Sequence, residues 1–308
     1  MGKVVATVFT THVPRLMIAD PVARRAYMGR SVTTFYDAMP KLERERIRHL
    51  DFDTFLLIDT HWFSTLEYVL NAHERLSGVY TSEELPEMLH GLEYDYRGDA
   101  ELARAVEMEA RERGIRAIAS AHSNLPIHYP TLNVMHYFNH EARRRVLPVS
   151  VCQTASVKND LAYGAAIGQA IWKSNRRVVI VASGGMSHKF WDYDRILDRA
   201  SASPDDIAST ANRLYDERIM EWFKAGRHDA VLAAADDYRA HCSPEGRFSH
   251  YITMAGAMGG ESWTWRGEQF GKYEAAIEKL FANSEAAYIQ VNSTTAGCFT
   301  FRIERAGA

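Results

Sequence analysis

Three apolar segments of this chain are each followed within a few residues by a histidine. The segments are residues 4–9, 55–58 and 178–182, and the histidines are His12, His61 and His188. Short apolar runs bounded by polar residues predict buried β-strands. In an open α/β sheet the carboxyl ends of the parallel strands lie at one edge, and ligands bind in the crevice outside it. The sequence therefore predicts three histidines at one edge of a sheet, with His61 just past the end of its strand.

The rest of the chain alternates between predicted strands and predicted helices. Residues 81–98 interrupt the alternation, because they contain Pro86, Gly91 and Gly98, show little periodicity and predict a long loop over the sheet. The remaining strands are predicted at residues 68–72, 115–119, 146–151, 287–291 and 298–303, and the helices at 32–49, 99–113, 131–138, 160–173, 203–224, 230–241 and 251–258.

This alternation predicts an α/β fold. We expect one domain, residues 1–308, with a central mixed sheet flanked by helices on both faces and a functional site at the carboxyl ends of the strands. The strand at 298–303 is expected to close an edge of the sheet. We expect roughly the last 50 residues to complete the subunit or to contact a neighbouring copy in a homo-oligomer, a dimer or a tetramer.

The composition argues against several classes of protein. The formal net charge is −3 and there is no block of five basic residues, so nucleic acid and anionic membranes are not expected partners. No apolar run reaches the roughly 18 residues of a membrane span, and no signal-peptide pattern precedes the first strand. Cys152, Cys242 and Cys298 are few and widely spaced, which indicates a reducing compartment and no zinc framework. We therefore expect a cytoplasmic protein.

His12 and His61 are candidate metal ligands. Two imidazoles and one carboxylate suit Fe(II), and such a site leaves positions open for oxygen chemistry. Asp59 is also placed to hydrogen-bond a ligand histidine and fix its tautomer. The alternative for either histidine alone is an ordinary hydrogen-bonded loop residue. The residues leave the carboxylate open among four candidates in predicted loops: Asp59, Glu83, Glu84 and Glu245.

His188 follows the glycine-containing stretch 183–187. Glycines permit a sharp turn close to a ligand, and a histidine there is suited to general acid and base catalysis. The alternative is a structural histidine in a turn. Tyr129 is a candidate hydrogen-bonding group for the site, although a half-buried loop tyrosine is the commoner case. Nine other histidines are predicted at surface or loop positions: His73, His90, His122, His128, His136, His140, His228, His241 and His250.

Four motifs occur in order along the chain: Thr11–Pro14, Asp59–Trp62, Gly78–Pro86 and Ser183–His188. Together they resemble the class III extradiol ring-cleavage dioxygenases, over residues 1 to about 260. The resemblance implies that His12, His61 and Glu245 bind iron and that His188 is the catalytic histidine. It also implies that Tyr129 occupies a second polar position of the active site.

The resemblance implies a function as well. We expect Fe(II)-dependent cleavage of a catechol by O2 to a 2-hydroxymuconic semialdehyde, with 3,4-dihydroxyphenylacetate or a related substituted catechol as substrate. Pro130 stands where relatives usually have Gly, and residues 288–293 do not reproduce an expected Gly-Thr-Gly pattern. The alternatives are a dioxygenase for a 2-aminophenol and a non-catalytic binding protein on the same fold. A zinc hydrolase is disfavoured because His-Glu-x-x-His is absent.

Overall fold

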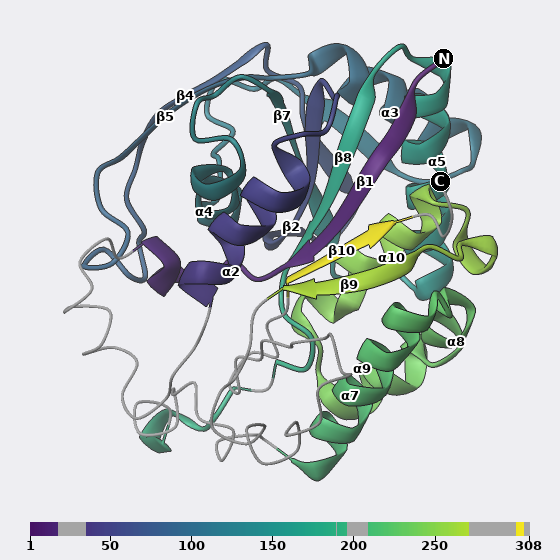
Figure 1. Ribbon diagram of the computed structural model, residues 1–308. Helices are drawn as coiled ribbons and strands as arrows, with labels where there is room; N and C mark the ends of the chain where they lie inside the picture. The colour runs from purple at the N-terminus through teal and green to yellow at the C-terminus, as the bar shows by residue number, and fades with distance from the viewer. Residues whose placement is uncertain (18–34, 189, 196–208, 271–299, 305–308) are drawn as a thin grey trace.

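The computed structural model describes residues 1–17, 35–188, 190–195, 209–270 and 300–304. An eight-stranded sheet crosses the molecule in the order β6-β3-β7-β2-β8-β1-β10-β9 (Figure 1). Its strands are β1 (Lys3–Thr10), β2 (Thr54–Ser64), β3 (Tyr68–Asn71), β6 (Ala117–Ser120), β7 (Arg145–Cys152), β8 (Arg177–Ser183), β9 (Arg266–Phe270) and β10 (Thr300–Glu304). The central strands β7, β2, β8 and β1 are parallel, whereas β3 pairs with β7 and β10 pairs with β1 in antiparallel orientation. The predicted mixed sheet is confirmed.

Helices cover both faces of this sheet, as predicted. Alternate side chains of β2 point to opposite sides, because Leu56 and Ile58 belong to one buried cluster while Phe55 and Leu57 belong to the other. Helices α3, α5 and α7–α10 pack on the first cluster, and α2 and α4 on the second. The helices are α2 (Phe35–Leu42), α3 (Ala100–Glu112), α4 (Tyr129–Phe138), α5 (Val157–Lys173), α7 (Thr210–Ala225), α8 (His228–Ala233), α9 (Ala235–Cys242) and α10 (Ser249–Ala257).

The predicted loop over residues 81–98 is wrong in part. Strands β4 (Arg75–Tyr80) and β5 (Leu92–Arg97) form a separate antiparallel hairpin, which projects beside β7 in Figure 1. The side chains of β5 alternate between half-buried and exposed, as expected of a strand with one packed face. Tyr94 and Tyr96 pack against the second core cluster. The turn residues at each end had hidden this short period-two pattern.

Three further predictions differ from the structure. β2 continues to Ser64, so His61 lies within the strand rather than just past it. β10 lies between β1 and β9, so the outermost strand on that side of the sheet is β9, which was not predicted. The helix predicted at 230–241 is divided into α8 and α9 at Ala234. The strand predicted at 287–291 and the starts of the helices predicted at 32 and 203 lie outside the described residues.

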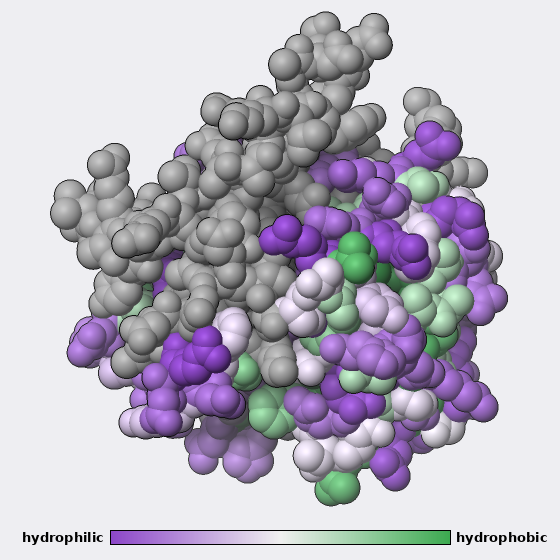
Figure 2. Space-filling model, turned by 90° about the horizontal axis from the view of Figure 1, so that it is seen from below, coloured by the Kyte–Doolittle hydropathy of each residue, from purple (hydrophilic) through white to green (hydrophobic). Residues whose placement is uncertain are grey.

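The surface of the described residues is mixed in character. In the face shown in Figure 2, their hydrophobic residues lie singly or in small groups among hydrophilic ones, as is usual for a protein surface. None of the described helices is long and apolar enough to cross a membrane.

Candidate metal centre

His12, His61 and Glu245 converge at the carboxyl edge of the sheet. Nε2 of His12 lies 3.0 Å from Oε1 of Glu245, and Nε2 of His61 lies 3.5 Å from the same oxygen. The three potential ligand atoms all lie within 4.8 Å of one another. Ligands held at roughly 2.1 Å on adjacent corners of one metal ion would lie about 3 Å apart. The donor types and their spacing therefore fit a metal ion.

A bulge in β2 places His61 at this edge. β2 pairs in regular register with β8 as far as Asp59, and its register with β7 shifts between Asp59 and Phe63. A bulge breaks the strict alternation of a strand and redirects its side chains. His61 lies in the irregular stretch, where its side chain is 38% exposed although its neighbours Thr60 and Trp62 are buried.

Asp59 supports this bulge and does not join the cluster. Its side chain is fully buried, and Oδ1 accepts hydrogen bonds from the backbone N–H groups of His61 (2.9 Å) and Trp62 (3.1 Å). Oδ2 accepts a hydrogen bond from Thr131 Oγ1 at 3.0 Å. The suggestion that Asp59 fixes a histidine tautomer is therefore wrong, because its bonds go to the backbone and to a threonine. Of the four candidate carboxylates, Glu245 is the one in the cluster.

Three neighbouring groups orient the cluster, and sequence reasoning missed all three. Ser183 Oγ lies 2.9 Å from Nδ1 of His12, so the other ring nitrogen of His12 faces Glu245. Thr60 Oγ1 donates to Oε1 of Glu245 at 2.7 Å. The backbone N–H of Gly185 donates to Oε2 of Glu245. Each of these residues lies inside a motif that carries a site histidine, and that proximity was the available signal.

The turn that carries Glu245 has an unusual backbone. Ser243, Gly246, Arg247 and Phe248 all have positive φ, between 45° and 60°. For side chains other than glycine this conformation costs roughly 1–2 kcal/mol per residue, and such strain clusters at functional sites. Phe248 is fully buried, and Arg239 Nε donates to the carbonyl oxygen of Arg247 at 2.6 Å. These contacts hold the turn in place.

Glycine is required at position 246 for a second reason besides its φ. A Cβ atom there would lie 2.6 Å from Cγ2 of Thr60, the residue whose hydroxyl holds Glu245. A larger residue would therefore push apart Thr60 and the turn.

His188 and Tyr129 lie beside the cluster. The backbone N–H of His188 donates to the carbonyl oxygen of Ser243 at 3.1 Å, two residues before Glu245. The His188 side chain is half-buried, and its ring packs on Phe190 with centroids 4.7 Å apart. Tyr129 begins α4, and its Oη lies 2.8 Å from Nε2 of His61. All five residues singled out by the sequence are thus in one region.

The protonation states of His61 and Glu245 suit ligand binding. Burial alone would raise the pKa of Glu245, but His12, with smaller contributions from His188 and His61, holds that pKa well below its usual range. Burial and then repulsion by His12 lower the pKa of His61 to about 4. Burial would lower the pKa of His12, but the charge of Glu245 outweighs it and raises that pKa. A neutral imidazole at His61 and an ionised Glu245 are the forms that bind metal ions.

Two histidines predicted at the surface are instead in the core. His228 and His250 are both fully buried. The ring nitrogens of His228 lie 2.7 Å from Tyr251 Oη and 2.9 Å from the carbonyl oxygen of Trp265. His250 stacks on Phe9 with centroids 5.1 Å apart, and burial lowers its pKa to about 3. Both therefore serve packing as neutral aromatic rings.

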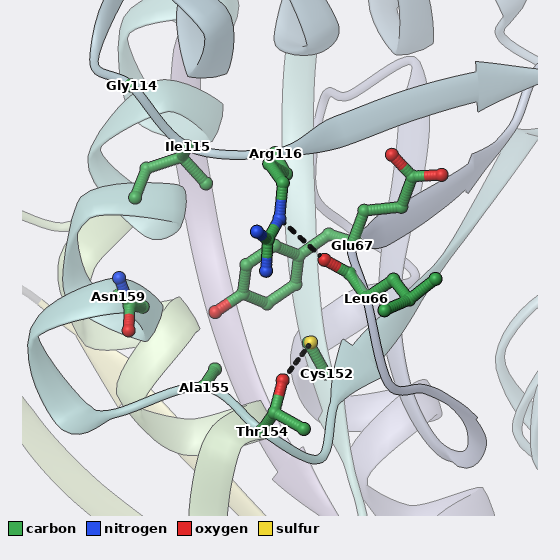
Figure 3. Close-up of a pocket in the computed structure, with 10 residues that line it drawn as sticks. Leu66, Glu67, Gly114, Ile115, Arg116, Cys152, Thr154, Ala155 and Asn159 are labelled. Carbon is green, nitrogen blue, oxygen red and sulfur yellow. Dashed lines mark hydrogen bonds between the residues drawn. The ribbon is translucent and has the colours of Figure 1, made fainter.

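A separate cavity of about 210 Å³ lies between three connections, β2 to β3, α3 to β6 and β7 to α5. Figure 3 shows Arg116 crossing it, with Nε donating to the carbonyl oxygen of Leu66 at 2.8 Å. None of the five candidate site residues lines this cavity. It is therefore distinct from the metal centre.

Comparisons with known proteins point to one family of enzymes. A family model described as the catalytic LigB subunit of aromatic ring-opening dioxygenase matches residues 6–279. The chain is 27% identical to 3,4-dihydroxyphenylacetate 2,3-dioxygenase of Escherichia coli over 264 residues, which cover 85% of this chain and 93% of that protein.

Two further proteins match much of the chain. It is 22% identical over 223 residues to the 2-aminophenol 1,6-dioxygenase beta subunit of a Pseudomonas species, with 70% of this chain and 72% of that protein covered. The crystal structure of an uncharacterized protein from Escherichia coli K12 matches with a TM-score of 0.59 and 13% identity. That match covers 97% of this chain and 99% of the other, and it shows a shared fold.

Proposed function

This chain belongs to the LigB family of aromatic ring-opening dioxygenases, and we propose that it is a non-haem, Fe(II)-dependent extradiol enzyme that cleaves a substituted catechol. The products of such a cleavage by O2 are 2-hydroxymuconic semialdehydes. Membership of an enzyme family sets aside the alternative of a non-catalytic binding protein.

The observation that carries this proposal is the convergence of His12, His61 and Glu245. Two imidazoles and one carboxylate on one side of a metal ion form the ligand set of non-haem Fe(II) oxygenases. When bound, Fe(II) supplies a template for both catechol oxygens and O2 and a route for electrons between them. Ser183 orients His12, and Thr60 and Gly185 hold the carboxylate of Glu245.

His188 is the proposed acid and base. Its half-buried side chain follows a segment that is hydrogen-bonded to the Glu245 turn, and it contributes no ligand atom to the cluster. A histidine outside the metal set can accept a phenolic proton from the catechol and return it later in the reaction. The imidazole would thereby make the substrate a better electron donor while the three ligands stay in place.

Tyr129 is proposed to contact the substrate. Its hydroxyl lies 2.8 Å from Nε2 of His61, the nitrogen that would bind the metal. One lone pair cannot both accept a hydrogen bond and bind a metal ion. Metal binding would therefore turn the Tyr129 hydroxyl away from His61 and toward the substrate side of the site.

The substrate class rests on the relatives. The match to 3,4-dihydroxyphenylacetate 2,3-dioxygenase covers more of this chain, at higher identity, than the match to the aminophenol enzyme. A catechol with a carboxylated side chain is therefore the first candidate. Ring cleavage of a 2-aminophenol is the second, because the aminophenol relative also spans most of the chain.

The aminophenol relative is named as a subunit, which favours an oligomer here, and we propose a homo-oligomer.

One experiment tests the function directly. Metal-free protein is reconstituted anaerobically with Fe(II) and given catechol, 3,4-dihydroxyphenylacetate, 3,4-dihydroxybenzoate or 2-aminophenol, with O2 uptake and product spectra recorded. We expect substrate-dependent O2 uptake and a yellow product, strongest with 3,4-dihydroxyphenylacetate. A preference for 2-aminophenol would favour the second candidate. Absence of O2 uptake with every substrate, in protein that holds one iron per subunit, would contradict the proposal.

A further inference from the structure

Asp216 is a buried carboxyl group that the proposed reaction does not use. It lies on α7, is 5% exposed, and has no ion-pair partner among the described residues. Its Oδ2 accepts from Ser187 Oγ at 2.6 Å, and its Oδ1 accepts from the Ser187 backbone N–H at 3.3 Å. Tyr238 Oη also donates to Oδ1, at 2.6 Å. Two of its three donors thus belong to the residue immediately before His188.

The segment around Ser187 is also tied to the turn of Glu245. The backbone N–H of Glu245 donates to the carbonyl oxygen of Met186 at 3.0 Å, and that of His188 donates to the carbonyl oxygen of Ser243 at 3.1 Å. These two bonds flank an antiparallel bridge between Ser187 and Pro244. In such a ladder the N–H of the central residue points away from the partner strand. That direction is where Asp216 lies.

Ser187 is therefore held from two sides. One side fixes the segment to the Glu245 turn, and the other fixes it to α7 and α9 through Asp216 and Tyr238. A buried carboxyl without a cation is costly, and burial raises the pKa of Asp216 to about 7. Three hydrogen bonds offset part of that cost. An apolar residue would avoid the desolvation cost of a buried carboxyl group. The carboxyl group is therefore explained by the hydrogen bonds that it accepts from Ser187 and Tyr238.

We propose that Asp216 is the positioning residue for His188, acting through the hydroxyl and backbone N–H of Ser187. The inference rests on the proposed function, because it assigns Asp216 to the histidine that moves protons. The hydrogen bonds of Asp216 go to Ser187 and Tyr238, and not to a ligand atom of the metal cluster or to the ring of His188. Its effect is on where the His188 imidazole stands relative to Glu245 and the substrate.

The kinetic test is a double-mutant cycle between Asp216 and His188. We expect Asp216→Ala to lower kcat by about 10- to 100-fold, which lies within the range of couplings between contacting groups, with iron content and KM close to wild type. Asp216→Asn keeps the shape and one acceptor, so it should recover most of kcat. In a His188→Phe background, Asp216→Ala should cause no further loss. An equal further loss, or loss of iron with kcat, would overturn the inference.

A second measurement needs no turnover. Hydrogen–deuterium exchange of the metal-free protein should accelerate over residues 183–188 in Asp216→Ala and stay unchanged over residues 54–60. Glu217→Gln is the matched control, because Glu217 is the next residue of α7 and is exposed. Unchanged exchange over 183–188 would overturn the positioning role even if the enzyme proved inactive on catechols. If the wild type is inactive on catechols but Asp216→Ala still exchanges faster than the wild type over residues 183–188, only the proposed function is rejected.

Discussion

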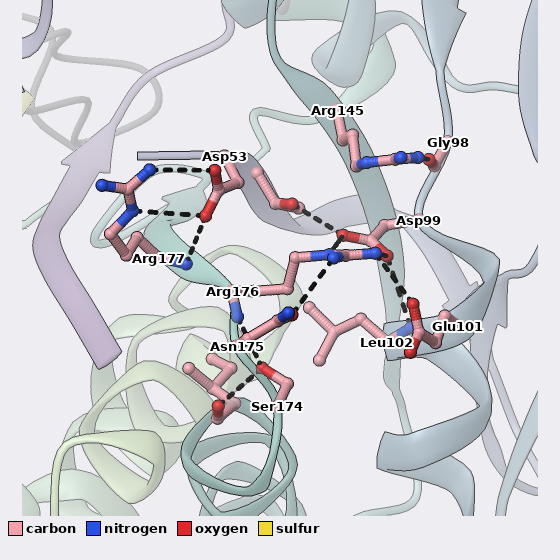
Figure 4. Close-up of polar contacts among 12 residues, drawn as sticks. Asp53, Gly98, Asp99, Glu101, Leu102, Arg145, Ser174, Asn175, Arg176 and Arg177 are labelled. Atoms are coloured by element: carbon pink, nitrogen blue, oxygen red, sulfur yellow. Dashed lines mark hydrogen bonds and ion pairs between the residues drawn. The ribbon is translucent and has the colours of Figure 1, made fainter. Parts of the chain in front are cut away.

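The two edges of the central sheet are built from different chemistry. At the amino edge, Arg177 pairs with Asp53 at 3.2 Å and Arg176 pairs with Asp99 at 3.0 Å, so each charge meets an opposite charge (Figure 4). At the carboxyl edge, two imidazoles and a carboxylate converge, and all three are potential ligands of a metal ion. The charged groups of the amino edge neutralise one another, whereas the groups of the carboxyl edge are arranged to bind a metal ion.

The backbone shows the same contrast. The amino edge consists of strand starts and the N-terminus of α3, where Asp99 caps the helix through the N–H of Leu102. The carboxyl edge contains the bulge after Asp59 and the left-handed turn after Glu245. Strain of this kind persists where the surroundings over-determine it. The comparison predicts that changes at the carboxyl edge alter function, and that changes at the amino edge alter stability.

The largest expected effect follows from removing a proposed metal ligand. His61→Ala should lose iron and lower turnover by about 10³-fold or more, because a metal ion contributes several kcal/mol to such reactions. The measurement is iron per subunit after anaerobic reconstitution, together with O2 uptake. Asp53→Asn, at the opposite edge, is the matched control and should keep its iron. Full iron and activity in His61→Ala would break the proposed ligand set.

The next effect separates proton transfer from metal binding at the same edge. His188→Phe should keep its iron and lose about 10²- to 10⁴-fold in kcat, the usual contribution of a general acid or base. The measurement is kcat at saturating substrate alongside iron content. Loss of iron in this variant would mean that His188 belongs with the ligands and would remove the division of labour between the histidines.

The sequence was informative about the fold wherever side chains followed one period. β1, β7 and β8 are mostly apolar and buried, and α3 begins after a capping Asp99 and ends before Gly114. The hairpin β4–β5 was missed because its short alternating stretches lie among turn residues. Burial of His250 was missed because only packing against Phe9, far away in the chain, makes an imidazole a core residue.

The site was predictable only in part. Strand ends located His12 and His61, but nothing in periodicity distinguished Glu245 from other loop carboxylates, and its choice depended on a family resemblance. The supporting contacts were invisible for a physical reason. Thr60 and Gly185 hold Glu245 through long-range contacts that exist only after three segments have folded together.

The third prediction moves to the amino edge. Asp99 is fully buried, pairs with Arg176 and accepts a hydrogen bond from Thr54 Oγ1 at 2.6 Å. Asp99→Ala leaves Arg176 without this partner and removes the cap of α3. We expect a loss of about 3 kcal/mol or more in the free energy of unfolding, measured by urea titration, with kcat and iron per folded subunit unchanged. A variant of unchanged stability but reduced turnover would invert the contrast between the edges.

The smallest expected effect concerns Asp53, whose side chain is 35% exposed beside Arg177. The hydrogen bond from Arg177 lowers the pKa of Asp53 below its ordinary value of 3.8. A group with a lowered folded-state pKa stabilises the protein above its unfolded-state pKa and loses that contribution as the pH falls through the folded-state value.

Asp53→Asn should therefore destabilise the protein by at most about 1 kcal/mol at pH 7, because the pair is solvent-screened. The difference in unfolding free energy between wild type and variant should shrink as the pH falls below about 4, near the unfolded pKa of an aspartate. Urea titrations at pH 7, 5, 4 and 3 measure that difference, and a gap that widened toward acid would show that Asp53 is not stabilised as a carboxylate by Arg177.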